Sequence, residues 1–198
     1  AASAIAELDT LAPNPLTRGL RLRQMCSGFL DTEGGEHHEF ECAKLSALKE
    51  FLEDFEAKVV IFCDFRRSID AVSELLDKLG MKHVILDGRQ ADKGIWRKFQ
   101  EDATVQAIIC QYQSSSAGID LYAADTCVFF EPTVSSNLNE QAKDRIHRIG
   151  QTRACSYIYL LTDGTIEWSI YSALRNYEDF GDALFTQYIE EYTKGGKL

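Results

Sequence analysis

Two arginines and a glutamine near residue 145 have the spacing of a chemical site. Gln141, Arg145 and Arg148 are four and three residues apart, which places them on one face of a helix if segment 136–148 is helical. Neighbouring guanidinium groups repel each other, so this pattern favours a polyanion between them, such as the terminal phosphates of a nucleotide. The alternative interpretation is a surface arginine pair neutralised by an acidic neighbour such as Asp144.

Further basic, hydroxyl and glycine residues directly follow apolar runs of the chain. Ligands of an open parallel sheet bind where the carboxyl ends of the strands meet, so residues just after a strand are candidates for binding. We expect these residues to gather on one rim together with segment 141–151. They are Arg66, Arg67, Gly88, Arg89, Ser114 and Ser115.

The elements that must position these residues follow an alternating pattern. Nearly continuous apolar, β-rich runs are typical of parallel strands buried on both faces, and helical patterns separate them here. The pattern therefore predicts an α/β fold with a parallel sheet. The expected strands are 58–65, 83–88, 107–112, 126–132 and 156–161, and the expected helices are 43–56, 67–79, 90–102, 136–148, 165–176 and about 179–193.

Composition limits the classes of protein that this chain can be. With 198 residues, 45% of them hydrophobic, it fits one globular domain. Its net charge of −10 opposes non-specific attraction to phosphate, so any contact with nucleic acid must be local. No apolar run approaches the roughly 20 residues of a membrane span, and the first residues lack a signal-peptide pattern. We expect an intracellular protein without a membrane partner.

The cysteines and histidines do not form a recognisable metal pattern. Six cysteines are spread along the chain without a Cys-x-x-Cys pair, which indicates reduced thiols. Cys26, His37, His38 and Cys42 have a spacing that matches no zinc finger or ribbon. We therefore expect no metal site.

Four segments, in order, resemble motifs of the Swi/Snf branch of superfamily-two helicases. KVVIFCDFRRSID (58–70) resembles motif four, LDGR (86–89) motif four-a, SAGIDL (116–121) motif five and QAKDRIHRIGQ (141–151) motif six. In addition, LRLRQMCSGFL resembles the stretch that leads out of the first lobe of this family, and GTIEWSIYSALRN the segment that closes the second lobe. The likeness covers most of the chain.

This resemblance implies an architecture and a role. The fold would be a RecA-like three-layer sandwich around a mostly parallel sheet of five to six strands. Residues 42–198 would form the C-terminal RecA-like lobe, and residues 1–41 a linker arm with the end of the preceding lobe. The function implied is that of the second motor lobe of an ATP-dependent double-stranded DNA translocase.

The resemblance also implies roles for single residues. Arg148 would be the arginine finger on the γ-phosphate of ATP, Arg145 its companion, and Gln141 a support of the nucleotide interface. Gly118 and Asp120 would lie beside the ribose, although a turn glycine and a helix cap are alternative interpretations. The residues that would face the DNA backbone are Arg66, Arg67, Gly88, Arg89, Ser114 and Ser115.

The chain departs from the family pattern in two places. Asp144 stands where many relatives have glycine, and Gln111 to Ser116 replace a Ser-Thr-Lys-Ala-Gly-Gly start of motif five. Which hydroxyl group meets a phosphate therefore stays open. The short connection between motifs five and six favours a bacterial or phage relative in the cytoplasm over a nuclear, eukaryotic one.

The first lobe would be the main partner. The sequence contains no Gly-x-x-x-x-Gly-Lys-Ser/Thr loop and no acidic magnesium-binding box, so the first lobe would hold most of the ATP with its magnesium, and this chain alone would be inactive. A non-catalytic module that binds DNA or protein is the main alternative. A self-contained α/β enzyme would need a nucleophile beside a base, and no such pattern is present.

Overall fold

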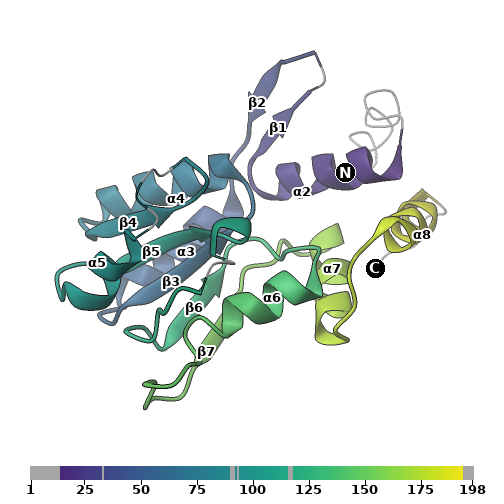
Figure 1. Ribbon diagram of the computed structural model, residues 1–198. Helices are drawn as coiled ribbons and strands as arrows, with labels where there is room; N and C mark the ends of the chain where they lie inside the picture. Colours follow the sequence, from purple (N-terminus) through teal and green to yellow (C-terminus); the bar gives the residue numbers. More distant parts are fainter. Residues whose placement is uncertain (1–13, 33, 90–91, 93, 116–117, 194–198) are drawn as a thin grey trace.

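A parallel sheet of five strands forms the centre of the protein (Figure 1). The computed structural model describes residues 14–32, 34–89, 92, 94–115 and 118–193. The strands occur in the order β4-β5-β3-β6-β7, and every neighbouring pair is parallel, which confirms the predicted α/β class. They are β3 (Val59–Cys63), β4 (His83–Leu86), β5 (Ala107–Gln111), β6 (Thr126–Phe129) and β7 (Ser156–Tyr159).

Alternate residues of the central strands pack into two separate cores. Val60 and Phe62 of β3 face one core, which includes residues of α5 (Trp96–Glu101) and α6 (Ser136–Lys143). Val59 and Ile61 face the other, which includes residues of α3 (Ala43–Glu53) and α4 (Arg66–Lys78). Because both faces are covered, the strand residues are apolar without alternation.

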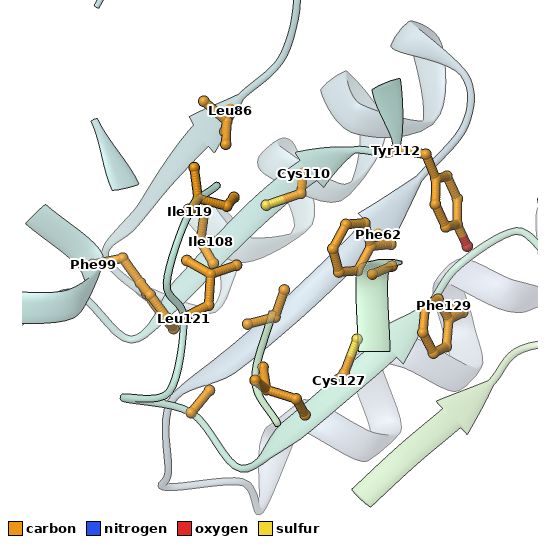
Figure 2. Close-up of a cluster of buried hydrophobic side chains, with 14 of the residues drawn as sticks. Phe62, Leu86, Phe99, Ile108, Cys110, Tyr112, Ile119, Leu121, Cys127 and Phe129 are labelled. Atoms are coloured by element: carbon orange, nitrogen blue, oxygen red, sulfur yellow. The ribbon is translucent and has the colours of Figure 1, made fainter. Parts of the chain in front are cut away.

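Stacked aromatic rings fill the first core near the carboxyl ends of the strands (Figure 2). The ring of Phe62 stacks on Tyr112 at a centroid distance of 5.2 Å and on Phe129 at 5.7 Å. The hydroxyl of Tyr112 donates a hydrogen bond to the carbonyl of Glu131 at 2.7 Å, which satisfies this buried polar group. The rings thereby support the loops that follow β5 and β6.

One predicted helix is shorter than expected. The sequence predicted a helix over 90–102, but α5 begins only at Trp96. The side chain of Asp92 accepts a hydrogen bond from the backbone N–H of Gly94 at 2.8 Å, a local bond typical of a turn, and such bonds compete with helix formation. Residues 90, 91 and 93 of that prediction lie outside the described part of the chain.

The segment before residue 42 contains ordered elements. Helix α2 (Pro15–Cys26) is capped by Asn14, whose side chain accepts from the Thr17 N–H at 2.8 Å. Strands β1 (Phe29–Asp31) and β2 (His37–Glu39) form an antiparallel hairpin next to α2 (Figure 1). The division of the chain at residue 41 stays a prediction.

Helix α2 packs on the C-terminal helices α7 (Ile166–Arg175) and α8 (Asp182–Thr193). Leu22 of α2 contributes to the apolar cluster that joins α7 and α8. Among the residues that the structure describes, none of the helices is both long and apolar enough to cross a membrane.

A buried ion pair fastens α3 to α7. The ammonium of Lys44 donates to Glu167 Oε1 at 2.5 Å, and the two side chains are only 3% and 1% exposed. Glu167 Oε2 accepts the backbone N–H of Thr162 at 2.8 Å, and Ser27 lies 3.4 Å from the ammonium. These bonds join α3 and α7 to the residues that follow α2 and β7 around one pair of charges.

Replacement of Lys44 should be strongly destabilising. Lys44→Met would leave the carboxylate of Glu167 buried without its cation, so we expect the free energy of unfolding to fall by about 3–5 kcal/mol in urea denaturation. Lys49→Met on the same helix is the control, because Lys49 pairs with Glu53 in solvent and should change stability by no more than about 0.5 kcal/mol. Similar losses in both variants would contradict this role of the pair.

Candidate functional site

The arginines of segment 141–151 do not share one helix face. Helix α6 ends at Lys143, and beyond it the N–H groups of Arg145 and Ile146 bond to the carbonyls three residues back, whereas the N–H of His147 bonds four residues back to Lys143. This tighter winding turns Arg145 inward, where it is 5% exposed, while the side chain of Arg148 is 36% exposed. The prediction of a continuous helix over 136–148 was therefore wrong in its last turn.

Gln151 holds the loop that follows α6. Its side-chain amide donates to the carbonyls of Ala124 at 2.7 Å, Tyr122 at 3.2 Å and Ile146 at 3.3 Å. Gly150, with φ at 107°, lets the chain turn back so that Gln151 points inward. One side chain thus ties the loop to the connection between β5 and β6.

Additional bonds fix the same two loops together. The Leu121 N–H donates to the carbonyl of Arg145 at 2.9 Å. Arg153 donates to the carbonyl of Ala123 at 2.8 Å, and its Nε lies 3.2 Å from Asp125 Oδ2. The position of Arg145 and Arg148 is therefore set by backbone contacts on both sides.

Arg148 holds a carboxylate from the opposite loop. Its Nη1 donates to Asp120 Oδ1 at 2.6 Å, and both side chains are partly exposed. Burial and the nearby charge of Arg148 lower the pKa of Arg145. An open hollow of the surface is lined by Asp120, Arg148 and their neighbours Asp144, His147 and Ile149.

The hollow combines the guanidinium of Arg148 with the carboxylates of Asp120 and Asp144. A carboxylate already occupies the guanidinium of Arg148, and phosphate oxygens bind to the same planar donors. Arg148 is the accessible cation, and the charge of the buried Arg145, which does not line the hollow, adds to the positive field near it. In the described part of the chain, no three His, Cys, Asp or Glu side chains are grouped to hold a metal ion.

The other residues predicted for nucleotide binding lie less close together. Gln141 is on α6, and its amide donates to Asn137 at 3.1 Å within the same helix. Gly118 has φ at 21°, and a Cβ atom there would meet nothing within 4 Å. Asp120 pairs with Arg148, whereas the amide of Gln141 pairs with Asn137.

A second group of predicted residues lies at the carboxyl ends of β3, β4 and β5, which are neighbours in the sheet. Arg66 begins α4 after β3, and its Nη2 would be 3.7 Å from a Cβ atom on Gly88. Arg89 donates from Nε to Asp87 at 2.6 Å and from Nη2 to Asp70 at 2.7 Å. Burial opposes the ionisation of Asp87, but the bonds from Arg89 outweigh it and lower the pKa of that carboxyl.

This second group, which we call the strand-end edge, also includes Arg67 and the two serines. Arg67 points to the β1–β2 hairpin, where its Nη2 lies 3.1 Å from Asp31 Oδ1. Ser114 and Ser115 lie in the 3₁₀ turn η1 (Gln113–Ser115), which follows β5. The edge thus contains all six residues predicted to face the DNA backbone.

The two groups do not gather on one rim, contrary to the sequence-based expectation. Because α6 connects parallel strands, it runs back along the sheet, and the chain returns to the start of β7 (Figure 1). Gln151 and Arg153 accordingly contact residues 122–125, which directly precede β6. Residues 144–151, which follow α6 and contain Arg145 and Arg148, are here called the arginine loop. This loop and the strand-end edge are separate surfaces.

A buried glutamate supports the strand-end edge, and sequence reasoning missed it. Glu131, 1% exposed, accepts the Asp64 N–H at 2.8 Å and the hydroxyl of Ser68. Burial raises the pKa of this carboxyl. Arg23 of α2 forms an ion pair with Asp64 and lies over the ring of Phe65 at 5.1 Å. Glu131 could have been noticed in the sequence, because it is a charged residue directly after an apolar strand.

The two histidines near residue 37 lie next to carboxylates of the hairpin. His37 Nδ1 lies 2.9 Å from Asp31 Oδ1, and its Nε2 lies 3.1 Å from Glu39 Oε1. His38 is more exposed and lies 4.0 Å from Glu36. The contacts of His37 tie the two strands of the hairpin to each other.

Comparison with known families agrees with this geometry. The family model of the helicase conserved C-terminal domain matches residues 43–150, which is more than half of the chain. The chain belongs to this family. The matched part begins at α3 and contains both the strand-end edge and the arginine loop as far as Gly150.

Relatives of this helicase C-terminal domain include Swi/Snf-type proteins. Helicase ssl-1 of Caenorhabditis elegans is 30% identical over 138 residues, 67% of this chain and 6% of its own length. Helicase swr1 of Schizosaccharomyces pombe is 30% identical over 135 residues, 65% of this chain and 10% of its own length. The chain therefore spans only a small part of these proteins.

A solved structure has the same fold. The crystal structure of the C-terminal part of the Fun30 ATPase domain superposes with a TM-score of 0.68 at 26% identity, covering 80% of this chain and 56% of that one. This confirms the resemblance of the helicase C-terminal domain to the second lobe of a Swi/Snf-type ATPase. The nematode and yeast relatives are eukaryotic, so they do not support the expected bacterial or phage source.

The anchoring by Gln151 can be tested through stability. Gln151→Glu keeps the size of the side chain but removes the N–H groups that face the three carbonyls, so we expect unfolding to become easier by about 1–3 kcal/mol. Gln141→Glu makes the same change on α6, where the amide bonds only Asn137, and should alter stability by about 0.5 kcal/mol or less. Equal urea midpoints for the two variants would disprove the anchoring role.

Proposed function

We propose that this helicase C-terminal domain is the second motor lobe of an ATP-dependent, double-stranded DNA translocase of the Swi/Snf type. The observation that carries the proposal is the arginine loop, in which Arg148 presents a partly exposed guanidinium next to the buried Arg145 and already holds a carboxylate. A module that only binds a partner would have no need for such a pair. The family and the fold support the same function.

In this proposal Arg148 contacts the γ-phosphate of ATP that the first lobe of the same protein holds with magnesium. ATP, when bound, supplies the phosphoryl group whose transfer to water drives the motor. Arg148 would exchange Asp120 for the phosphate and stabilise the negative charge that develops there. Arg145 would add to the positive field, and Gln141, Gly118 and Asp120 would line the nucleotide interface.

The strand-end edge would be the DNA track of this lobe. Arg66, Arg67, Arg89 and the η1 serines lie at the ends of three neighbouring strands, which is where an open sheet binds its ligands. Few cations are present, so the contacts would be to backbone phosphates without sequence preference. In a eukaryotic cell this function would place the protein in the nucleus.

The first expected outcome concerns the chain alone. Because the phosphate loop and the magnesium ligands are assigned to the first lobe, the purified 198-residue chain should hydrolyse ATP no faster than background. The measurement is phosphate release with and without DNA. Steady turnover that survives repurification and disappears in Arg148→Ala would show a complete site in this chain.

The second expected outcome concerns Arg148 in the full-length protein. Arginine fingers contribute roughly 10³ to 10⁵ in rate, so Arg148→Ala should nearly abolish DNA-stimulated ATP turnover. Arg148→Lys should be almost as slow, because a flexible ammonium cannot reproduce the planar donors. Stability should change by about 1 kcal/mol or less, since the pair with Asp120 is partly exposed.

Arg175→Ala, an exposed arginine in the last turn of α7, is the matched control and should keep the wild-type rate. Thermal melts would establish that each variant is folded. A folded Arg148→Ala protein with more than about a tenth of the wild-type turnover would rule out the finger assignment and favour the non-catalytic module instead.

A further inference from the structure

The β1–β2 hairpin binds one of the two adjacent arginines at the start of α4. Arg67 Nε lies 3.3 Å from Asp31 Oδ2, and its Nη2 lies 3.1 Å from Asp31 Oδ1. The guanidinium also lies over the ring of Phe29 at 5.9 Å. One edge of the guanidinium is thus in bidentate contact with a carboxylate, and one face meets an aromatic ring.

The carboxylate of Asp31 is held in position from its other side. His37 is its direct partner across the hairpin, and the Nδ1 atom of this histidine lies 2.9 Å from Asp31 Oδ1. Burial opposes the ionisation of Asp31, but Arg67 and His37 outweigh it and lower the pKa of the carboxyl. Asp31 therefore carries its negative charge toward Arg67 at neutral pH.

The neighbouring arginine points elsewhere. Arg66 lies next to Gly88 at the end of β4, within the strand-end edge, whereas Arg67 contacts the hairpin. Two cations that follow the same strand are therefore directed to different surroundings, Arg67 to the hairpin and Arg66 to the end of β4.

We propose that Asp31 competes with DNA phosphate for Arg67, so that the hairpin sets how tightly this lobe holds the DNA backbone. This inference rests on the proposed function, in which Arg67 contacts DNA. A carboxylate in bidentate contact with arginine occupies the same donors that a phosphate would use. Arg67 must release Asp31 before a phosphate can take that edge.

The exposure of the pair makes this exchange possible. The side chains of Arg67 and Asp31 are 47% and 38% exposed, and ion pairs in solvent are weak. By contrast, the ion pair of Lys44 with Glu167 is buried and cannot exchange in this way. Asp31 thus lowers the effective positive charge of the edge, and Arg67 can still leave Asp31 to bind a phosphate.

The experiment measures DNA affinity of the full-length protein as a function of salt. Asp31→Asn keeps the size of the side chain but removes its charge, so Arg67 can meet a phosphate without first releasing a carboxylate. Because the competing ion pair is exposed and contributes about 1 kcal/mol or less, affinity near 0.1 M salt should rise by up to about fivefold. The slope of log affinity against log salt should change little, since Arg67 meets the same phosphate in both proteins. Asp31→Ser is a second variant with the same expectation, in case the first does not fold.

The double variant shows whether the effect passes through Arg67. Arg67→Ala alone should weaken binding, and Asp31→Asn should have little further effect in the Arg67→Ala background. Glu39→Gln is the control, because it removes the same charge from the same hairpin, and Glu39 contacts His37 rather than Arg67. Its small effect on affinity should be equal in both backgrounds.

The outcomes separate this inference from the proposed function. If Arg66→Ala and Arg67→Ala weaken DNA binding but Asp31→Asn does not raise the affinity, the competition is disproved while the DNA track stands. If neither arginine variant alters DNA binding, the track itself is wrong, and the competition fails with it.

Discussion

The burial of the central strands on both faces is the constraint on which the rest of the structure depends. Val59, Val60, Ile61, Phe62 and Cys63 of β3 are all without solvent exposure. Polar side chains cannot lie along such strands without a large cost in free energy, so the chemistry of this protein is confined to the strand ends and the connecting loops. The parallel topology then decides at which end each loop lies.

One buried ion pair joins the segment before residue 42 to the sheet, and another joins two of the helices. Arg23 of α2 pairs with Asp64 after β3, and Lys44 of α3 pairs with Glu167 of α7. Glu131 accepts the Asp64 N–H beneath the strand-end edge. A carboxylate or ammonium of this kind needs its partner to remain folded, so these residues couple the position of α2 to the edge proposed to bind DNA.

Acidic side chains pair with the arginines of both candidate surfaces. Arg67, Arg89 and Arg148 each contact at least one carboxylate of the same chain, although they are the cations expected to meet phosphates. A protein with a net charge of −10 has many carboxylates available for such pairs. In the proposed function, phosphate binding at these arginines would be an exchange of one anion for another, and it would be sensitive to salt.

Sequence patterns were most reliable where burial alone selects the residues. All five strands of the central sheet were predicted, because a run such as VVIFC has no face left for polar residues. The strands β1 and β2 were not predicted. The end of α6 was predicted wrongly, because the helical spacing of Arg145 and Arg148 says nothing of the tighter turn after Lys143. Glu131 and the anchoring role of Gln151 were missed, since their partners lie far away in sequence.

The sequence by itself determined the α/β class, the family likeness and the residue types of both surfaces, because these depend on local pattern and order along the chain. Only the tertiary structure decided that the arginine loop and the strand-end edge are separate, since the direction of α6 follows from the parallel pairing of β6 and β7. It also decided which carboxylate each arginine holds. Arg67 and Asp31 are 36 residues apart, and no local pattern can pair residues that meet only when the chain folds.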